Sequence, residues 1–167
     1  MQGKRVRESS ILLAQVMNPQ DANPAGNVHG GVIMKLIDTA AGAAAVKHSR
    51  SNCVTASIDR LDFHHPVFIG DMVTLKAGVT YTGKSSMEVG VRVESQNLLT
   101  GEIRHTVSAY MTFVALDKNG RPTAIPPLIL ETPEELRRNR EAQSRRETRL
   151  REKTKEKACQ LNAESCD

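Results

Sequence analysis

A polar loop followed directly by an apolar helix carries the residues best able to do chemistry. Asn23 lies in the loop, His29, Gly30 and Gly31 close it, and Asp38 follows within the helical segment. A carboxylate on an apolar helix could act as a general base towards water, or as a nucleophile. An asparagine could orient that water or hold a carbonyl group, because its side chain both donates and accepts hydrogen bonds.

The two glycines stand where the predicted helix begins. The first N–H groups of a helix have no partner within it and lie at the positive end of its dipole. Because glycine has no side chain, a carbonyl oxygen could approach the N–H groups of Gly30 and Gly31, and His29 could add a polar contact. The spacing therefore predicts an oxyanion-binding site here, where each donor contributes on the order of 10²- to 10³-fold in rate.

Each of these residues also has a purely structural interpretation. Asp38 could pair with Lys35, three positions earlier, and Asn23 could simply shape the loop through an Asx turn. His29 could pack within the loop. Asp38 would be partly desolvated if the helix around it were buried, which would favour proton uptake by the carboxylate.

The surrounding elements are predicted from hydrophobic periodicity. An extended segment precedes the loop, a long alanine-rich helix follows it, and the period then changes from 3.6 to 2. This order predicts an α+β domain in which a curved antiparallel sheet of about five to six strands wraps one long buried helix. One helix cannot cover both faces of a sheet, so we expect a second subunit. The predicted strands are residues 9–17, 54–59, 73–81, 87–94 and 104–116, and the helix covers 32–48.

The C-terminal region has a different composition from the rest of the chain. The net charge is +4, from 23 Lys plus Arg and 19 Asp plus Glu, and residues 131–167 hold 19 charged side chains in 37 positions. Such a mixed-sign tract is typical of a solvated helix face. Thr132, Pro133 and Glu135 form a helix start signal. We predict a domain over 1–130 and a charged helical extension over 131–167, exposed and frayed beyond about Lys157.

Several classes of function are disfavoured by composition. Aromatic residues make up 3% of the chain and Trp is absent, which argues against a single-stranded nucleic-acid reader. The apolar run 11–13 is too short for a signal peptide, and no run could span a membrane. The three cysteines lack CxxC spacing and predict a reducing compartment, so we expect a cytoplasmic protein. His64 and His65 are adjacent on an extended chain, which makes a poor metal-chelating pair.

Residues 21–38 resemble the signature of hotdog-fold acyl-CoA thioesterases, the brain-type cytosolic acyl-CoA hydrolases and their bacterial relatives. Further segments in the same order are similar to that family, and the resemblance covers about residues 9–127. The region after Glu131 lies outside it. The segments are Val54-Thr55-Ala56-Ser57-Ile58-Asp59, Asp62-Phe63-His64-His65-Pro66-Val67, Gly70-Asp71 and Thr82-Gly83-Lys84-Ser85-Ser86-Met87.

The resemblance implies a hotdog fold, dimers paired edge to edge, and often trimers of such dimers. It implies hydrolysis of fatty acyl-CoA to free acid and CoA without a metal or cofactor, with Asn23 and Asp38 supplied by opposite subunits. In a CoA enzyme, Lys84, Ser85 and Ser86 at a predicted turn could bind phosphate groups, with Arg60 a second candidate. Alternatives are another acyl-thioester enzyme, such as a dehydratase, or a non-catalytic acyl-CoA sensor.

Overall fold

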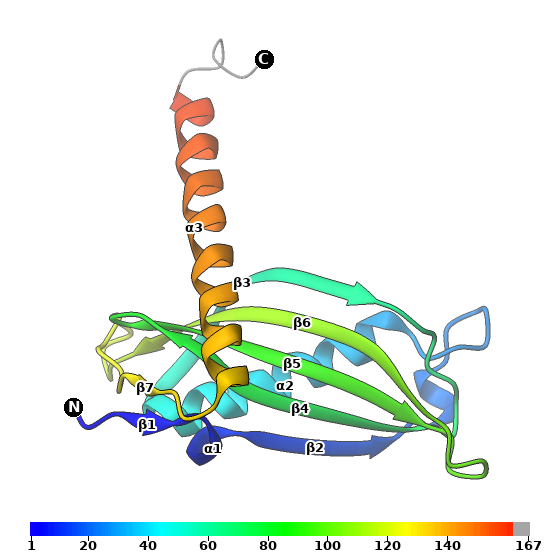
Figure 1. Cartoon of the computed structure of the whole chain (residues 1–167). Helices are drawn as coiled ribbons and strands as arrows, with labels where there is room; N and C mark the ends of the chain where they lie inside the picture. The colour runs from blue at the N-terminus through cyan, green and yellow to red at the C-terminus, as the bar shows by residue number, and fades with distance from the viewer. Residues whose placement is uncertain (162–167) are drawn as a thin grey trace.

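The computed structural model describes residues 1–161 of the chain, as one five-stranded antiparallel sheet with helices on both faces (Figure 1). The predicted strands and the long helix are all present. In chain order the elements are β1 (Lys4–Arg5), α1 (Val6–Ser9), β2 (Ile11–Val16), a 3₁₀ turn (Pro19–Asp21), α2 (Gly30–Ser49), β3 (Asn52–Phe63), β4 (Met72–Thr82), β5 (Ser86–Gln96), β6 (Ile103–Leu116), β7 (Leu128–Ile129) and α3 (Pro133–Leu161).

The order of strands in the sheet is β2-β4-β5-β6-β3, so β2 and β3 form its edges. β1 and β7 make a small separate parallel pair. The β3–β6 register shifts twice, between Thr55 and Ser57 and again between Ile58 and Arg60. Such bulges bend a strand and re-aim its side chains. The edge strand β3 runs to Phe63, well beyond the segment 54–59 that alternation predicts, because these irregularities interrupt the period of two.

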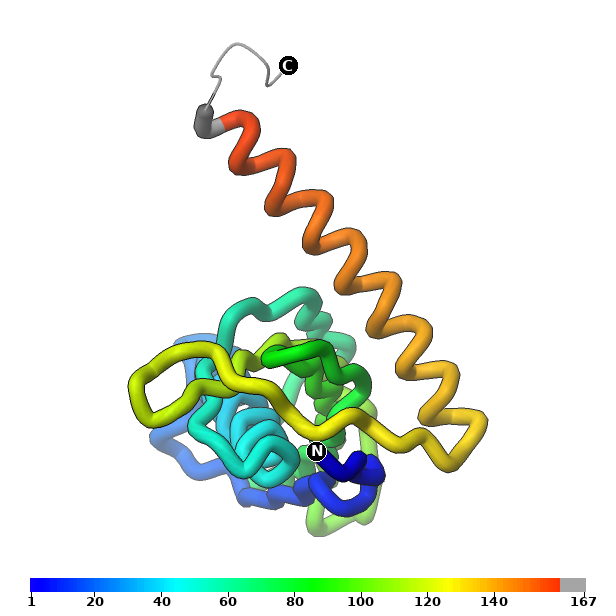
Figure 2. The backbone as a smooth tube through the Cα atoms, turned by 90° about the vertical axis from the view of Figure 1, so that its left-hand side faces the viewer, coloured from blue at the N-terminus to red at the C-terminus, as the bar shows by residue number. Residues whose placement is uncertain are grey.

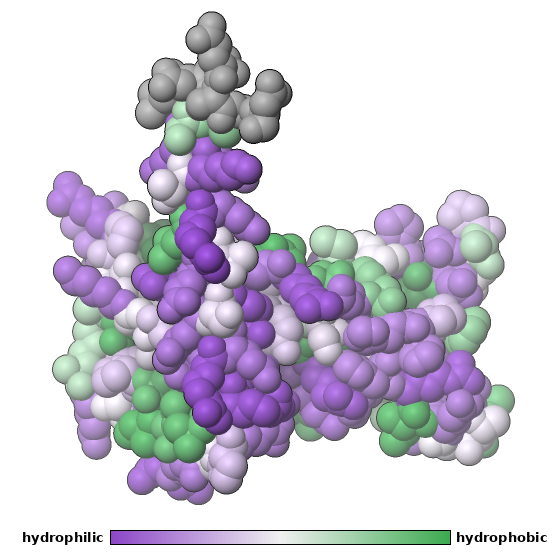
Figure 3. Space-filling model, turned by 45° about the horizontal axis from the view of Figure 1, so that its top comes forward, coloured by the Kyte–Doolittle hydropathy of each residue, from purple (hydrophilic) through white to green (hydrophobic). Residues whose placement is uncertain are grey.

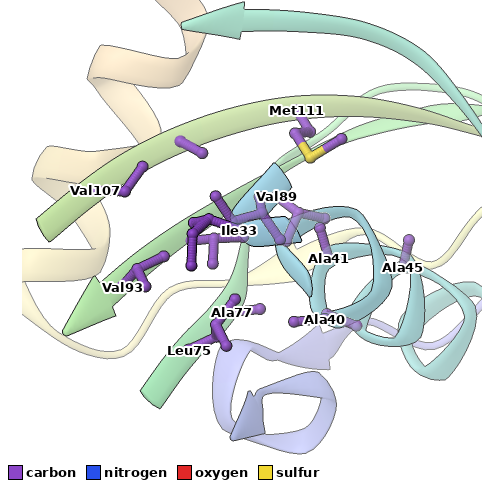
Figure 4. Close-up of a cluster of buried hydrophobic side chains, with 14 of the residues drawn as sticks. Ile33, Ala40, Ala41, Ala45, Leu75, Ala77, Val89, Val93, Val107 and Met111 are labelled. Carbon is purple, nitrogen blue, oxygen red and sulfur yellow. The ribbon is translucent and has the colours of Figure 1, made fainter. Parts of the chain in front are cut away.

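Helix α2 packs against the concave face of the sheet (Figure 2). Its alanines let the helix lie close to the strands, whose alternate side chains fill the space between them. The predicted burial on nearly every side is wrong for a single subunit, because one face of α2 is open and Met34 and Val46 are 41% and 44% exposed. Figure 4 shows this core, in which Ile33, Ala40, Ala41 and Ala45 of α2 lie among Leu75, Ala77, Val89, Val93, Val107 and Met111.

Helix α3 lies on the opposite face of the sheet from α2 (Figure 2), and the prediction that it is wholly exposed is wrong. Ala142 of α3 is fully buried. Arg145 of the same helix makes a two-point ion pair with Glu88 of β5, which is 2% exposed. The Arg145 guanidinium also lies 3.6 Å from the ring centre of Tyr110 on β6. Sequence periodicity missed this contact because arginines, not apolar residues, face the sheet.

The start of α3 follows its sequence signal. The Thr132 hydroxyl accepts from the Glu135 N–H at 3.2 Å, and the Glu135 carboxylate accepts from the Thr132 N–H, which makes a reciprocal capping box. The helix continues to Leu161, past the predicted fraying point. Cys53 is a free thiol, whereas Cys159 is disulfide-bonded.

Candidate active site

The carboxylate of Asp38 lies on the open face of α2 and is hydrogen-bonded to β3. The Thr55 hydroxyl donates to Asp38 Oδ1 over 2.7 Å. Lys35, the cation proposed as an alternative partner, makes no ion pair among the described residues, and its carbonyl accepts from Thr39. Asp38 is exposed within the subunit, so the expected desolvation of its carboxylate is absent from a single chain. The remaining carboxylate oxygen is open to an incoming group.

Thr55 is a site residue that the sequence analysis did not single out. It lies in a segment that resembles the thioesterase family, but a threonine on an alternating strand reads as an ordinary strand residue. Its role depends on its register. Thr55 stands opposite Phe113 of β6, whose side chain is in the core, so Thr55 shares the face that α2 covers. Only the packing of β3 beside α2 shows that it meets Asp38.

The side chain of Asn23 closes its own loop. Asn23 Oδ1 accepts from the N–H groups of Ala25 and Asn27, over 2.9 and 3.2 Å. Because both partners are backbone donors, the amide atom that faces them is the oxygen. The Nδ2 group then points away and has no partner among the described residues. The Asx-turn interpretation is therefore confirmed, and it defines the chemistry that remains. Asn23 can donate a hydrogen bond to a water or a carbonyl oxygen, while its acceptor is already used.

The start of α2 supplies one open backbone donor where two were predicted. His29 is the N-cap residue, and its Nδ1 accepts from the Gly31 N–H over 2.9 Å. In a neutral ring the proton is then on Nε2. The Gly30 N–H has no acceptor among the described residues and stands at the positive end of the helix dipole. In this structure the Gly30 N–H, and not the Gly31 N–H, is the open backbone donor at the helix start.

Asn23 and Gly30 both line a cavity of about 340 Å³. Its wall is largely apolar and includes Ile33 and Phe63, whose ring is half exposed. A Cβ on Gly30 would lie 3.5 Å from Phe63 Cζ, so the ring stands directly beside the open N–H. The cavity therefore combines two hydrogen-bond donors with an apolar surface. That combination suits a carbonyl group attached to a hydrocarbon chain.

The two halves of the predicted site are separate in one subunit. Asp38 does not line the cavity that holds Asn23 and Gly30, and Asn23 does not contact the Asp38 and Thr55 pair. Asp38 lies eight residues beyond Gly30 along α2, and a helix rises about 1.5 Å per residue. Within each subunit, the Asp38 carboxylate thus lies outside the donor cavity, and the donor cavity lacks that carboxylate.

The residues predicted to bind CoA phosphates lie at the other end of the molecule. Lys84 and Ser85 form the turn between β4 and β5, beside the C-terminal end of α2, whereas the Asn23 loop lies at its N-terminal end (Figure 1). Lys84 is exposed. Ser86 begins β5, where its carbonyl accepts from the Gly83 N–H and closes the turn. Arg60, on β3, is paired with Asp62 and is 67% exposed.

The histidines following β3 are not arranged as metal ligands. The His64 ring lies 5.1 Å from that of His105, centre to centre, and His105 is bonded to Ser108. Among residues 1–161, no group of three or more His, Cys, Asp or Glu side chains is placed to hold a metal ion. Over the same part of the chain, no helix is long and apolar enough to cross a membrane.

Comparison with known proteins places this geometry in a family. Residues 25–102 match the model of the thioesterase superfamily. YkhA, an uncharacterized acyl-CoA thioester hydrolase of Bacillus subtilis, is 41% identical over 130 residues, which are 78% of this chain and 76% of the relative. The cytosolic acyl coenzyme A thioester hydrolase of Rattus norvegicus is 36% identical over 84% of this chain, and the match spans 37% of that longer protein.

Solved structures share the fold. A hexameric acyl-CoA thioesterase in its apo form superposes with a TM-score of 0.88 at 40% identity, over 91% of this chain and 97% of its own. The acyl-CoA hydrolase of Staphylococcus aureus, solved with butyryl coenzyme A and coenzyme A, superposes with a TM-score of 0.88 at 33% identity. The match covers 97% of this chain and 99% of that one.

The same Staphylococcus aureus protein has been solved with an asparagine, an aspartate or a threonine replaced by alanine. Those three positions are separated by 15 and 17 residues, as are Asn23, Asp38 and Thr55 in this sequence. The fold, the arrangement of α2 within the sheet and the identity to whole relatives agree. The chain belongs to the hotdog-fold acyl-CoA thioester hydrolases.

Proposed function

We propose that the protein hydrolyses fatty acyl-CoA to a free fatty acid and CoA in a site shared by two subunits. The observation that carries the proposal is the division of the site: Asp38, held by Thr55, faces out of one subunit, while Asn23 and the Gly30 N–H face an apolar cavity. Two copies related by a two-fold axis would bring each half to the other. The names and hexameric state of the relatives support the same conclusion.

The chemistry follows from the groups present. The sulfur leaving group is a thiol whose pKa is about 8.5, so it departs with little help from an acid. In one route Asp38 takes the proton of a water, whose oxygen attacks the carbonyl carbon and displaces the CoA thiolate. In the other route Asp38 attacks the carbonyl carbon and displaces the thiolate to form an anhydride, which water then cleaves. The Gly30 N–H and Asn23 Nδ2 donate to the carbonyl oxygen as negative charge develops on it. The reaction so described needs no metal or cofactor.

CoA itself carries phosphate groups, and we assign their binding to the β4–β5 turn. Lys84 is exposed there, and Ser85 and Ser86 add hydroxyl donors. The turn and the donor cavity are at opposite ends of one subunit, so the phosphates of a substrate lie against a different copy from its acyl chain. Arg60, already paired with Asp62, is the weaker candidate. We also assign the protein to the cytoplasm, with no nucleic-acid partner.

Thiol release from a short-chain and a long-chain acyl-CoA tests the activity. Asp38→Asn keeps the shape of the side chain and removes the base, so kcat falls by about 10²-fold or more. Asn23→Asp keeps the oxygen that closes the loop and removes the Nδ2 donor. A normal rate in Asp38→Asn, with the fold intact, would remove Asp38 from the mechanism. CoA binding without thiol release by the wild type would favour a sensor, and conversion of the acyl group without thiol release would favour a dehydratase.

Mixing the two inactive variants tests the shared site. In a mixed dimer, Asn23 of the Asp38→Asn subunit meets the intact Asp38 of the Asn23→Asp subunit, so one of its two sites is complete. After random exchange in an equal mixture, about half of the dimers are mixed and half of their sites are complete. About a quarter of the wild-type activity is therefore restored. A site contained within one subunit gives no recovery, because both chains are then defective. Each variant incubated alone under the same exchange conditions is the control.

A further inference from the structure

Helix α3 crosses the outer face of the sheet strand by strand. Asn139 Nδ2 donates to the carbonyl of Thr80 on β4 over 2.7 Å, and Arg145 pairs with Glu88 on β5. Arg149 then pairs with Asp59 on β3, which is the edge strand. These contacts fall on strands progressively nearer the β3 edge, so α3 runs across the sheet and leaves it at that edge (Figure 1).

Beyond this last anchor, α3 continues past the β3 edge. Residues 150–158 are all exposed, and the helix extends to Leu161. We call residues 150–161 the arm. In the space-filling view of Figure 3, hydrophilic side chains gather along the helix as it rises from the body. An isolated helix as short as the arm is marginally stable in water. A helix that is polar on all sides and surrounded by solvent is typical of one that bridges to another protein body.

The arm carries an apolar residue where it passes the edge. Leu150 is 44% exposed, directly after the Arg149 anchor. Thr154 and Ala158 follow at intervals of four, so the three side chains share one face of the helix. The face is narrow and uncharged in an otherwise highly charged segment. It is suited to contact with another protein surface.

The surface beneath the arm is also incomplete. A cavity of about 400 Å³ lies between α3 and the edge strand, with Ser57 and Ile58 on one side and Glu152 and Lys153 on the other. Ile58 is 44% exposed. Because β3 is an edge strand, one side of its backbone has no neighbouring strand in the subunit. The unpaired edge of β3, the exposed Ile58 and the overhanging part of α3 therefore lie together on one surface of the subunit.

We propose that the arm lies across the outer sheet face of a second copy of this chain, joined through the β3 edge. The inference rests on the two-subunit site proposed above. A copy paired at β3 continues the sheet beyond the edge, and a helix that passes the edge on the outer face must then lie over the second sheet. Two-fold symmetry makes the contact reciprocal, so the arm of each subunit packs on the sheet of the other.

Cross-linking in mixed oligomers tests the contact directly. Unlabelled and ¹⁵N-labelled full-length protein are mixed, allowed to exchange subunits, and treated with a lysine-reactive cross-linker. Lys153, Lys155 and Lys157 lie on the arm. Cross-links that join an arm peptide of one isotope to a peptide of the other isotope are expected. Arm cross-links found only between peptides of the same isotope, in a sample whose subunits have exchanged, overturn the proposal.

A matched pair of leucines on α3 tests the energetic role. Leu150→Glu places a charge on the contact face of the arm, whereas Leu136→Glu changes a leucine of similar exposure, 49%, at the other end of the helix. Glutamate is a good helix former, so both variants keep α3. Leu150→Glu weakens self-association by about tenfold or more in sedimentation dilution series, which is about 1.4 kcal/mol. An unchanged association in Leu150→Glu, or an equal loss in Leu136→Glu, overturns the proposal.

Thiol release by the same samples separates this inference from the proposed function. A wild-type chain that hydrolyses acyl-CoA and associates, but gives no arm cross-link between copies, refutes the arm alone. A wild-type chain that neither associates nor releases thiol refutes the shared site, and the arm with it. An active chain that remains a monomer refutes the shared site while leaving thioester hydrolysis in place, and again refutes the arm.

Discussion

The Thr55 hydroxyl donates a 2.7 Å hydrogen bond to Asp38 Oδ1, and thereby joins the edge strand to the central helix on the face that the subunit leaves open. A carboxylate on a helix surface has several rotamers of similar energy. A short bond to a strand residue restricts it, and the other oxygen remains available to a water. Thr55 thus positions the carboxylate that we propose as the base, and occupies one of its acceptor sites.

Replacing Thr55 with valine keeps the size and branching of the side chain and removes this bond. Hydrogen bonds to charged groups contribute about 1.5–3 kcal/mol, so kcat falls by about 10- to 100-fold while the fold is kept. Steady-state thiol release is the measurement. Thr39→Val is the control, because Thr39 neighbours Asp38 and bonds only to the Lys35 carbonyl. Equal rates for the two variants would argue against the positioning role, and Thr55→Ser should retain most of the activity.

Gly30→Ala separates catalysis from stability at the helix start. The added methyl lies at ordinary contact distance, 3.5 Å from Phe63 Cζ, and alanine favours a helix over glycine by about 1 kcal/mol. Stability should therefore hold or rise, while kcat falls because the methyl crowds the open N–H. At Gly31 a Cβ would lie 3.0 Å from His29 Nδ1, so Gly31→Ala disturbs the cap and lowers the melting temperature. Full activity in Gly30→Ala would remove this N–H from the oxyanion site.

Arg145→Met tests how α3 is held on the sheet. The change leaves the carboxylate of Glu88 buried without its cation, and such a loss costs about 3 kcal/mol. Urea unfolding at fixed protein concentration measures it. Arg146→Met is the control, because that guanidinium lies 5.8 Å from the Tyr81 ring and makes no ion pair among the described residues. Adding Glu88→Gln to Arg145→Met should recover part of the loss. A small effect in Arg145→Met would mean that α3 docks by other contacts.

His48 makes stability depend on pH. Its ring is fully buried, with Nδ1 bonded to Ser9 and Nε2 to the Pro126 carbonyl. Burial lowers the pKa of His48 below 6.5, and Lys4 lowers it further, against opposing effects of the Pro126 bond and Glu8. Between the folded pKa and 6.5 the unfolded chain binds more protons, so stability is lost as the pH falls below 6.5.

The variant His48→Gln tests this dependence, since an amide can keep both hydrogen bonds and does not titrate. Thermal unfolding from about pH 7 to about pH 5 should show a flatter pH dependence than the wild type. His65→Gln, a change at an exposed histidine, is the control and should leave the pH dependence of thermal stability unchanged. The same slope in His48→Gln and wild type would assign the acid sensitivity to other groups.

Lys84→Ala tests the phosphate assignment at the β4–β5 turn. The loss of one cation should raise KM for acyl-CoA by several-fold and leave kcat near the wild-type value. Acyl-pantetheine, which lacks the nucleotide phosphates, should be hydrolysed equally by both proteins. Lys118→Ala, in the exposed turn after β6, is the control. An unchanged KM in Lys84→Ala would place the phosphates elsewhere.

Much of the fold was predictable because it depends on local pattern. Alternation located β4, β5 and β6, and the absence of Pro with apolar residues in most positions located α2. The capping signal Thr132, Pro133 and Glu135 located the start of α3 to the residue. The family resemblance added the hotdog arrangement. Burial was less predictable: α2 has an open face, and α3 is docked by arginines that periodicity treats as solvated.

The sequence by itself determined the residue types of the site and the order in which they occur: an asparagine loop, glycines at a helix start, and a carboxylate within that helix. Tertiary structure decided how they are used. Loop closure occupies the Asn23 oxygen, the His29 cap occupies the Gly31 N–H, and strand register brings Thr55 to Asp38. The first two contacts are local, between residues two positions apart, and only the folded backbone shows which donor or acceptor each one uses up. The Thr55 contact depends on how β3 packs beside α2, which residue spacing along the chain does not encode.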